Sequence, residues 1–416
     1  MKSLICLIVA VFLSIGANSF ARTLWEDPID ANDTVSIHST LNGTFLQSTS
    51  ALQPSDSGNS SIGFGRLRVE PMYRVGDFVF DGAYDNQLIE DNQPVSSLSL
   101  LPNTSPVAFR INQVGGTVFK NNDSFDYNEL DRLFVTYQKE GTQITFGRQA
   151  IGWGRGTSFS AVDIFLPFTP FQFDREWKRG VDAILAEEKI SEHVSAELVY
   201  AASPDWDGSA LGGRFRGAFD KFDYELLVAK RAQDTMWAMT SSAPVAGAEV
   251  HAEFAVFDTP GDFPSAEFLG RSNLVPKSVL GVSNNFAVGN GITTSLEYHY
   301  SGFGASSARE FNEWIKIPSY QSRITRGDTQ IYGNQALALS LGYLFNEKWQ
   351  AGVENIFSLI DSSGACVPSV TWDFSDNSSF IATAFLPYGA APSDYQLNSQ
   401  FGSSAQIFIV QLRLYD

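Results

Sequence analysis

The segment 249–256, with the sequence EVHAEFAV, carries the pattern that decides the fold of this chain. Positions 250, 252, 254 and 256 are apolar, whereas Glu249, His251 and Glu253 stand between them. Successive side chains of a β-strand point to opposite faces of its sheet. A period of two residues therefore predicts a strand with one apolar and one polar face.

The same alternation recurs along the chain in segments of about 8 to 13 residues, which turn residues separate. We predict about 18 such strands, and 16 stays possible because the segment 235–242 (TMWAMTSS) is included partly to make the number even. The predicted strands begin near residues 33, 61, 77, 128, 142, 180, 193, 210, 222, 235, 248, 277, 291, 332, 349, 366, 379 and 404.

The connections between these strands alternate in length. The even-numbered ones are all short: Val75-Gly76, Lys139-Glu140-Gly141, Glu188 to Glu192, Asp220-Lys221, Ala243 to Gly247, Gly289-Asn290, Asn346-Glu347-Lys348 and Ser375 to Ser378. Three odd-numbered ones are short as well, and the others are the long segments 49–60, 85–127, 151–179, 258–276, 303–331 and 389–403. Outer-membrane barrels have short periplasmic turns, long external loops and an even number of strands. The sequence therefore predicts an all-β fold, a transmembrane antiparallel β-barrel.

The first 21 residues have the features of a cleavable secretory signal. Lys2 precedes an apolar stretch from Leu4 to Leu13, and small residues stand at positions 19 and 21. After Ala21 no apolar run approaches the roughly 18 to 20 residues of a transmembrane helix, so membrane spans must be strands. We expect a signal peptide at 1–21 and one barrel domain at 22–416, since no linker divides the rest.

The charge and motif content exclude several functions. The formal charge of -18 argues against nucleic-acid binding, which needs a basic surface. No nucleophile motif surrounds chance pairs such as Ser295 and His299, so we expect no enzyme and no cofactor. His251 between Glu249 and Glu253 could suggest a metal site, but no ligand spacing supports one, and residues lining a lumen are the simpler interpretation.

The segment 151–179 is unusually rich in glycine, proline and phenylalanine for a solvated loop. It must pack on something, either folded inward to narrow a pore or lying across the barrel mouth as a cap. Charged residues gather in it and at its base: Arg155, Asp163, Asp174, Arg175, Glu176, Lys178 and Arg179.

This region resembles a large set of bacterial outer-membrane β-barrel proteins, which are mostly uncharacterised or porin-like. The shared arrangement is GRQ at a strand end (147–149), W-G-x-G (153–156), D-I-F-x-P (163–167) and G-V-D-A opening the next strand (180–183). The predicted strand number is also similar to that of the alginate-export porin family. The resemblance covers about a tenth of the chain and leaves the solute open.

Assigning the polar phase of each strand to the lumen predicts which charged residues line or constrict the pore. They are Arg66, Arg68, Arg132, Arg155, Asp163, Asp174, Arg214, Arg216, Glu249, Glu253, Glu297 and Arg413. Barrel closure puts Arg413 one strand away from Arg66, and Glu197, Asp223 and Glu225 can neutralise the arginines of the eighth strand. Carboxylates dominate the later strands, which predicts a mild cation preference. The alternative is that these are only the polar residues that any water-filled lumen needs.

The predicted function is a passive outer-membrane channel for small polar or oligomeric solutes. The alternative is a structural or adhesive barrel with a plugged lumen, which binds partners through the long connections 85–127 and 303–331. Expected partners are outer-membrane lipids and the barrel assembly machinery. The oligomeric state is left open.

Overall fold

The computed structural model describes residues 22–26, 33–49, 59–91, 107–121, 124–170, 172, 175–263, 266–393 and 396–416, so the predicted signal peptide lies outside the described residues. The elements are β1 Arg22–Glu26, β2 Thr34–Thr49, β3 Asn59–Val75, β4 Phe78–Asp91, β5 Gly115–Gly116, β6 Ser124–Lys139, β7 Thr142–Gln149, β8 Val181–Ser191, β9 Val194–Ala201, β10 Ala210–Phe219, β11 Phe222–Arg231, β12 Asp234–Val245, β13 Ala248–Asp258, β14 Leu274–Phe286, β15 Ile292–Ser301, α2 Ala308–Trp314, α3 Pro318–Arg326, β16 Gln335–Asn346, β17 Trp349–Ser358, β18 Gly364–Ser375, β19 Ser378–Tyr388 and β20 Gln406–Tyr415.

The long strands form one closed antiparallel barrel. From β2 to β20 each strand pairs with the next along the chain, with β4 pairing β6, and β20 pairs back with β2. Leaving out the short β1 and β5, this gives the 18 strands that the sequence predicted. The doubtful strand is confirmed as β12, which pairs along its length with β11 and β13. Asn42 of β2 stands in register with both Arg413 and Arg66, so the predicted spacing of these arginines is confirmed.

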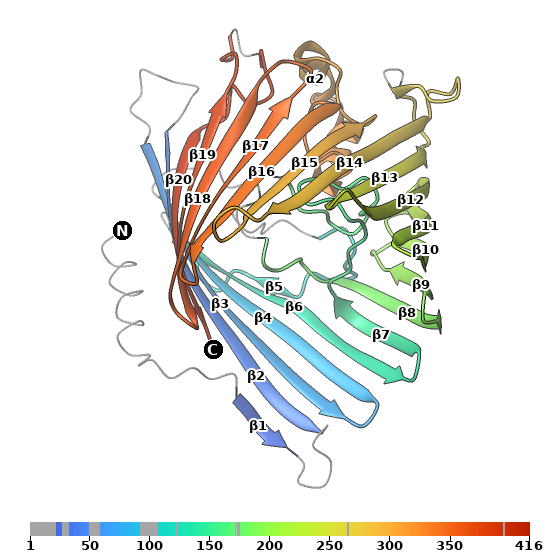
Figure 1. Ribbon diagram of the computed structural model, residues 1–416, viewed down its shortest axis with the longest axis vertical. Coiled ribbons are helices and arrows are strands. Elements are labelled where there is room, and N and C mark those ends of the chain that lie inside the picture. Colours follow the sequence, from blue (N-terminus) through green and yellow to red (C-terminus); the bar gives the residue numbers. More distant parts are fainter. Residues whose placement is uncertain are drawn as a thin grey trace.

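Short turns lie at one end of the barrel and the long connections lie at the other (Figure 1). In the turn between β12 and β13, Ala246 and Gly247 both have positive φ angles of 52° and 87°, as tight hairpins require. Among the long connections, the predicted bounds of 85–127 differ most from the structure. The predicted loop 85–127 begins and ends inside strands, because β4 continues to Asp91 and β6 starts at Ser124.

Outward and inward faces follow the predicted alternation. In β13, Val250 and Phe254 are 39% and 38% exposed, whereas His251 and Glu253 are 4% and 1% exposed. Among the described helices, none is long and apolar enough to cross a membrane. At the short-turn end the outer surface carries exposed aromatic side chains, as the interfacial belt of a membrane barrel does. They include Tyr73, Phe78, Phe80, Phe219, Phe222, Phe286, Phe345, Trp349, Trp372, Phe374 and Phe380.

The inner face is apolar toward the long-connection end. There, wall residues such as Leu46, Ile62 and Phe64 are buried in one cluster with loop residues such as Phe109 and Phe165. Parts of the long connections therefore lie inside the barrel, as Figure 1 shows for the segment between β7 and β8. The polar lumen that the sequence predicted is confined to part of the barrel.

Candidate functional site: a lumen narrowed by inserted loops

The connection between β7 and β8 folds inward across the lumen. Phe159 and Phe165 are buried, and Trp153 packs edge-to-face on Phe165 with ring centroids 5.0 Å apart. The indole Nε1 of Trp153 donates to Glu197 on the barrel wall at 2.6 Å. Of the two predicted arrangements, the inward fold is the one observed.

The side chain of Glu253 in β13 binds the backbone of this loop. Its Oε1 accepts hydrogen bonds from the backbone N–H groups of Arg155 and Gly156, the latter at 2.9 Å. Its Oε2 accepts from the backbone N–H of Ala161 at 2.7 Å and from the Ser160 hydroxyl at 3.1 Å. Glycine is needed beside this carboxylate, since Gly154 has a φ of 106° and a Cβ there would lie 2.7 Å from Glu253 Oε1.

Glu297 of β15 binds the next residues of the loop in the same way. Its Oε1 accepts from the Thr157 N–H at 2.6 Å, and its Oε2 accepts from the N–H groups of Ser158 and Phe159 at 2.9 and 3.1 Å. The ring Nε2 of His251 lies 2.9 Å from Oε1. Glu253 and Glu297 were predicted to line the pore. Each is 1% exposed, so their inward position is as expected but the loop covers them.

The loop then returns along the opposite wall. Glu176 lies 3.4 Å from Arg413, and the Trp177 ring stacks under the guanidinium groups of Arg66 and Arg68 at 4.7 and 5.3 Å. Arg179 donates to Glu129 at 3.0 Å. The charged residues that were predicted at the base of the loop thus contact different strands of the wall and do not form one cluster. Asp174, also predicted, lies outside the described residues.

A cavity of ≈ 600 Å³ remains between the loop residues Pro170, Gln172, Arg175 and Glu176 and the wall from β16 to β20. Arg175 faces Glu354 across it at 3.8 Å. Its inward-facing wall residues are Ser340, Glu354, Val367, Ser369, Ile381, Thr383, Phe385, Ile409 and Arg413. Of the predicted pore residues that the structure describes, only Arg413 lines this cavity.

The arginines of the second predicted strand are not free charges. Arg66 donates to Asp85 at 2.7 Å, and Arg68 donates to both Asp85 and Asp131 at 2.9 Å. Arg110, from the inserted segment 107–121, pairs with Glu129 and donates to Asp131 at 3.0 Å. Sequence reasoning missed Asp85, which it placed in a loop, and it missed the inserted arginine altogether. Arg132 lies at the edge of this network and is partly exposed.

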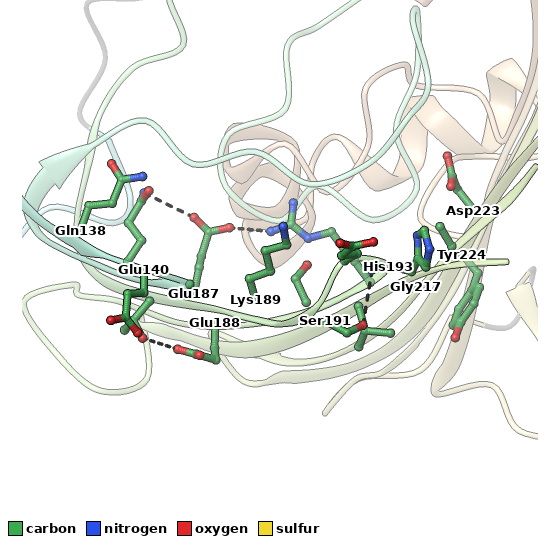
Figure 2. A pocket seen from close by; sticks show the side chains of 18 of the residues that line it. Gln138, Glu140, Glu187, Glu188, Lys189, Ser191, His193, Gly217, Asp223 and Tyr224 are labelled. Atoms are coloured by element: carbon green, nitrogen blue, oxygen red, sulfur yellow. Dashed lines mark hydrogen bonds and ion pairs between the residues drawn. The ribbon is translucent and has the colours of Figure 1, made fainter. Parts of the chain in front are cut away.

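A second pocket of ≈ 520 Å³ opens at the short-turn end (Figure 2). The figure shows Glu187 and Asp223 on one side of the wall, with Glu188 and Tyr224 on the other. Arg214 pairs with Glu197, one of the carboxylates that the sequence suggested. Arg216 lies in this pocket and donates at 2.5 Å to Glu187, which was not predicted, and Asp223 lies 3.7 Å from Arg155 instead.

The remaining predicted pore residues are distributed over several places in the barrel. Arg155 also lines the pocket in Figure 2 and donates to the Ser242 hydroxyl at 2.8 Å. Glu249 is exposed near the same end, and Asp163 pairs with Lys178 inside the loop. The structure therefore brings the predicted residues to one lumen but to several separate sites in it.

The connection between β15 and β16 has its own buried charges around Asp328. Arg231 and Arg326 pair with Asp328, and Arg323 lies 3.2 Å from it and 2.8 Å from Asp234. Burial alone would raise the pKa of Asp328, but the charges of Arg231 and Arg326 outweigh it and lower that pKa to about 2. The ionised carboxylate thus fixes α3 and the following residues to the top of β11 and β12.

We predict that Asp328 makes the fold sensitive to acid. A carboxyl group whose pKa is lower in the folded state stabilises the fold above its ordinary pKa of 3.8, and this contribution disappears as the pH falls through about 2. Its size is about 2 kcal/mol at neutral pH. Asp328→Asn should lower the unfolding temperature at pH 7 and reduce its change between pH 5 and 2, as followed by heat-modifiable mobility.

The exposed Asp262, in another long connection, provides the matched substitution Asp262→Asn. It should leave both the unfolding temperature and its pH dependence unchanged. Equal behaviour of the two variants would show that Asp328 does not stabilise the fold.

Neither a metal site nor a catalytic pair is formed by the residues considered above. Within the described ranges, no group of three or more His, Cys, Asp or Glu side chains is placed to hold a metal ion. His299 is buried and stacks on Phe159 with ring centroids 4.5 Å apart, and neither of its ring nitrogens has a hydrogen-bond partner in the described part of the chain. It is therefore not positioned to activate Ser295.

A closed 18-stranded antiparallel barrel with an apolar outer face and an inward-folded loop defines a transmembrane β-barrel of the outer-membrane type. The fold is similar to that of OccAB1 of Acinetobacter baumannii, with a TM-score of 0.54 and 11% identity over 96% of this chain and 99% of that one. For the outer membrane protein OprD of Pseudomonas aeruginosa the TM-score is 0.51, with 9% identity over 92% of this chain and 93% of that one. For a BenF-like porin of Pseudomonas fluorescens Pf-5 it is 0.52, with 10% identity over 92% and 99%. No protein-family model and no curated protein sequence matches the chain.

Proposed function

We propose that this protein is an outer-membrane channel for the passive passage of small polar solutes. The observation that carries the proposal is the cavity beside Arg175 and Glu176, which leaves space between the inserted loop and the barrel wall. Charged side chains from both the loop and the wall line it, as is usual where a pore is narrow. The fold shared with solved porins supports the same function.

We further propose that the narrow part of the pore is formed by Arg175, Glu176, Glu354 and Arg413. The predicted cation preference would then depend on accessible carboxylates such as Glu249 and Glu354. Glu253 and Glu297 contribute little to it directly, because the loop covers them. Arg66, Arg68, Arg214 and Arg216 act as members of paired networks rather than as free cations.

Purified chain 22–416, reconstituted in planar lipid bilayers, should give stepwise conductance. A variant lacking residues 158–170 should give larger steps, because this part of the loop fills the lumen with buried side chains such as Phe159 and Phe165. Heat-modifiable mobility in gels checks that both chains are folded.

Two results would contradict the channel. One is a folded native chain that does not conduct while the deletion variant does, which is the behaviour of a plugged barrel that binds partners through its loops. The other is an absence of conductance from both folded chains.

A further inference from the structure

The described residues that line the cavity beside Arg175 and Glu176 carry charges of both signs. Among its described lining residues, Arg175 and Arg413 are cationic, and Glu176 and Glu354 are anionic. A solute with a single charge is attracted by two of these groups and repelled by the other two. The electrostatics of the cavity thus favour a solute that carries both charges.

The two ion pairs that cross the cavity are long and partly accessible. Arg175 and Glu354 are 3.8 Å apart with side chains 30% and 22% exposed, and Arg413 and Glu176 are 3.4 Å apart. Charge-assisted hydrogen bonds are typically about 2.7 to 2.9 Å long. The pair between Arg66 and Asp85, at 2.7 Å and almost fully buried, meets this description. Three of these four groups also make a shorter hydrogen bond: Glu354 accepts from the Ser158 hydroxyl at 2.7 Å, Arg413 donates to Gln411 at 2.6 Å, and Arg175 donates to the Pro170 carbonyl. The pairs across the cavity are nevertheless long and partly exposed, so a solute can contact these side chains on the side that faces the cavity.

The wall of the cavity adds an apolar surface next to these charges. Val367, Ile381, Phe385 and Ile409 come from neighbouring strands and face the same space, with hydroxyl groups from Ser369 and Thr383 between them. A volume of ≈ 600 Å³ lies within the range of about 300 to 1,000 Å³ of small-molecule sites. Such a lining fits an apolar group attached to a polar end.

We propose that this cavity binds, during passage, a small zwitterion that carries an apolar group, with the chemistry of an apolar α-amino acid. The carboxylate of the solute contacts Arg413 or Arg175, its ammonium group contacts Glu354 or Glu176, and its apolar group lies on Ile381, Phe385 and Ile409. The inference rests on the proposed channel function, since the cavity must be reached through the lumen.

The test compares how three molecules of similar size block the ionic current through the reconstituted chain. They are phenylalanine, 3-phenylpropionate, which has only the carboxylate, and 2-phenylethylamine, which has only the ammonium group. Phenylalanine should block at a concentration about tenfold lower than the other two, since each loses one charge-assisted hydrogen bond. Glycine, without the apolar group, should block weakly.

Two substitutions assign the contacts. Glu354→Gln should weaken the block by phenylalanine about tenfold and leave the block by 3-phenylpropionate unchanged or stronger. Arg413→Gln should weaken the block by phenylalanine and leave that by 2-phenylethylamine unchanged or stronger. Glu249→Gln, which removes an exposed carboxylate outside the lining of this cavity, serves as the control.

The outcomes separate this inference from the proposed function. A chain that conducts but is blocked equally by the three aromatic molecules overturns the zwitterion site and leaves the channel. The same holds if Glu354→Gln and Arg413→Gln behave like Glu249→Gln. A folded chain without conductance overturns both.

Discussion

Replacing Glu253 with Gln should increase the conductance of the channel and make the open current fluctuate. Both carboxylate oxygens of Glu253 accept hydrogen bonds from the inserted loop, with Gly156 N–H on one and Ala161 N–H on the other. A Gln side chain in either orientation directs its NH₂ group at a backbone N–H. Hydrogen bonds to a charged group are worth about 1.5 to 3 kcal/mol each, so the loop should be held less firmly by a few kcal/mol.

Glu297→Gln should act in the same direction, because Glu297 binds Thr157, Ser158 and Phe159 through both of its oxygens. The double variant should give the largest steps in single-channel recordings. Protease sensitivity of the loop in the folded, reconstituted chain provides a second readout, since a loop released from its anchors becomes accessible.

The matched control is Glu249→Gln, which removes the same charge from the same strand as Glu253 but from an exposed position. If all three carboxylates acted only on ion selectivity, the three variants would shift the reversal potential alike and leave the step size unchanged. That result would show that Glu253 and Glu297 do not hold the loop. Larger steps for Glu253→Gln and Glu297→Gln alone would support anchoring.

The strands could be predicted from sequence because their determinants are local. Within each strand, a period of two residues distinguishes the inward face from the outward face. Short turns such as Ala246-Gly247 mark one end of the barrel. The closure of the barrel was predicted from the even number of strands, without any predicted contact between the first and the last strand. The register of Asn42 with both Arg413 and Arg66 shows that this topological argument was sufficient.

The contents of the lumen could not be predicted in the same way. Toward the long-connection end the inner face carries apolar residues such as Ile62 and Ile89, which pack on inserted loops instead of facing water. With both faces apolar, alternation no longer distinguishes inside from outside. A different pattern ended the predicted strand before Asp85: residues 85–87 (DNQ) are polar on both faces and resemble a loop, although β4 continues to Asp91.

The partners of the charged side chains also could not be predicted from the sequence. Arg68 and Asp131 are 63 residues apart and meet only because β3 and β6 flank β4. Glu253 and Glu297 were correctly assigned to the lumen face, but nothing in their strands indicates that backbone groups of a distant loop bind them. Gly154 was the available signal, since a Cβ there would lie 2.7 Å from Glu253 Oε1.

Replacing Arg68 with Met should destabilise the barrel more than any single change at its surface. Arg68 is 0% exposed, and with Arg66 and Arg110 it balances the buried carboxylates of Asp85, Glu129 and Asp131. Two partly exposed groups add one charge of each sign to this network: Glu70 lies 2.9 Å from Arg68, and Arg179 lies 3.0 Å from Glu129. Its removal leaves Asp85 and Asp131 near each other with one uncompensated negative charge. Breaking one side of a buried ion pair costs about 3 to 5 kcal/mol. The temperature at which heat-modifiable mobility is lost should fall markedly, and less folded protein should be recovered from refolding into detergent.

Two further variants distinguish charge balance from loss of packing. Arg132→Met changes a partly exposed arginine 3.9 Å from the same Asp131 and should cost little, because water already solvates it. Adding Asp131→Asn to Arg68→Met restores two cations against two carboxylates, so the double variant should be more stable than Arg68→Met alone. If the second substitution instead adds its own full cost, the buried charges act independently and the balanced network does not account for the stability of this wall. Met retains most of the apolar stem of Arg68, so a cavity effect alone predicts no rescue by Asp131→Asn.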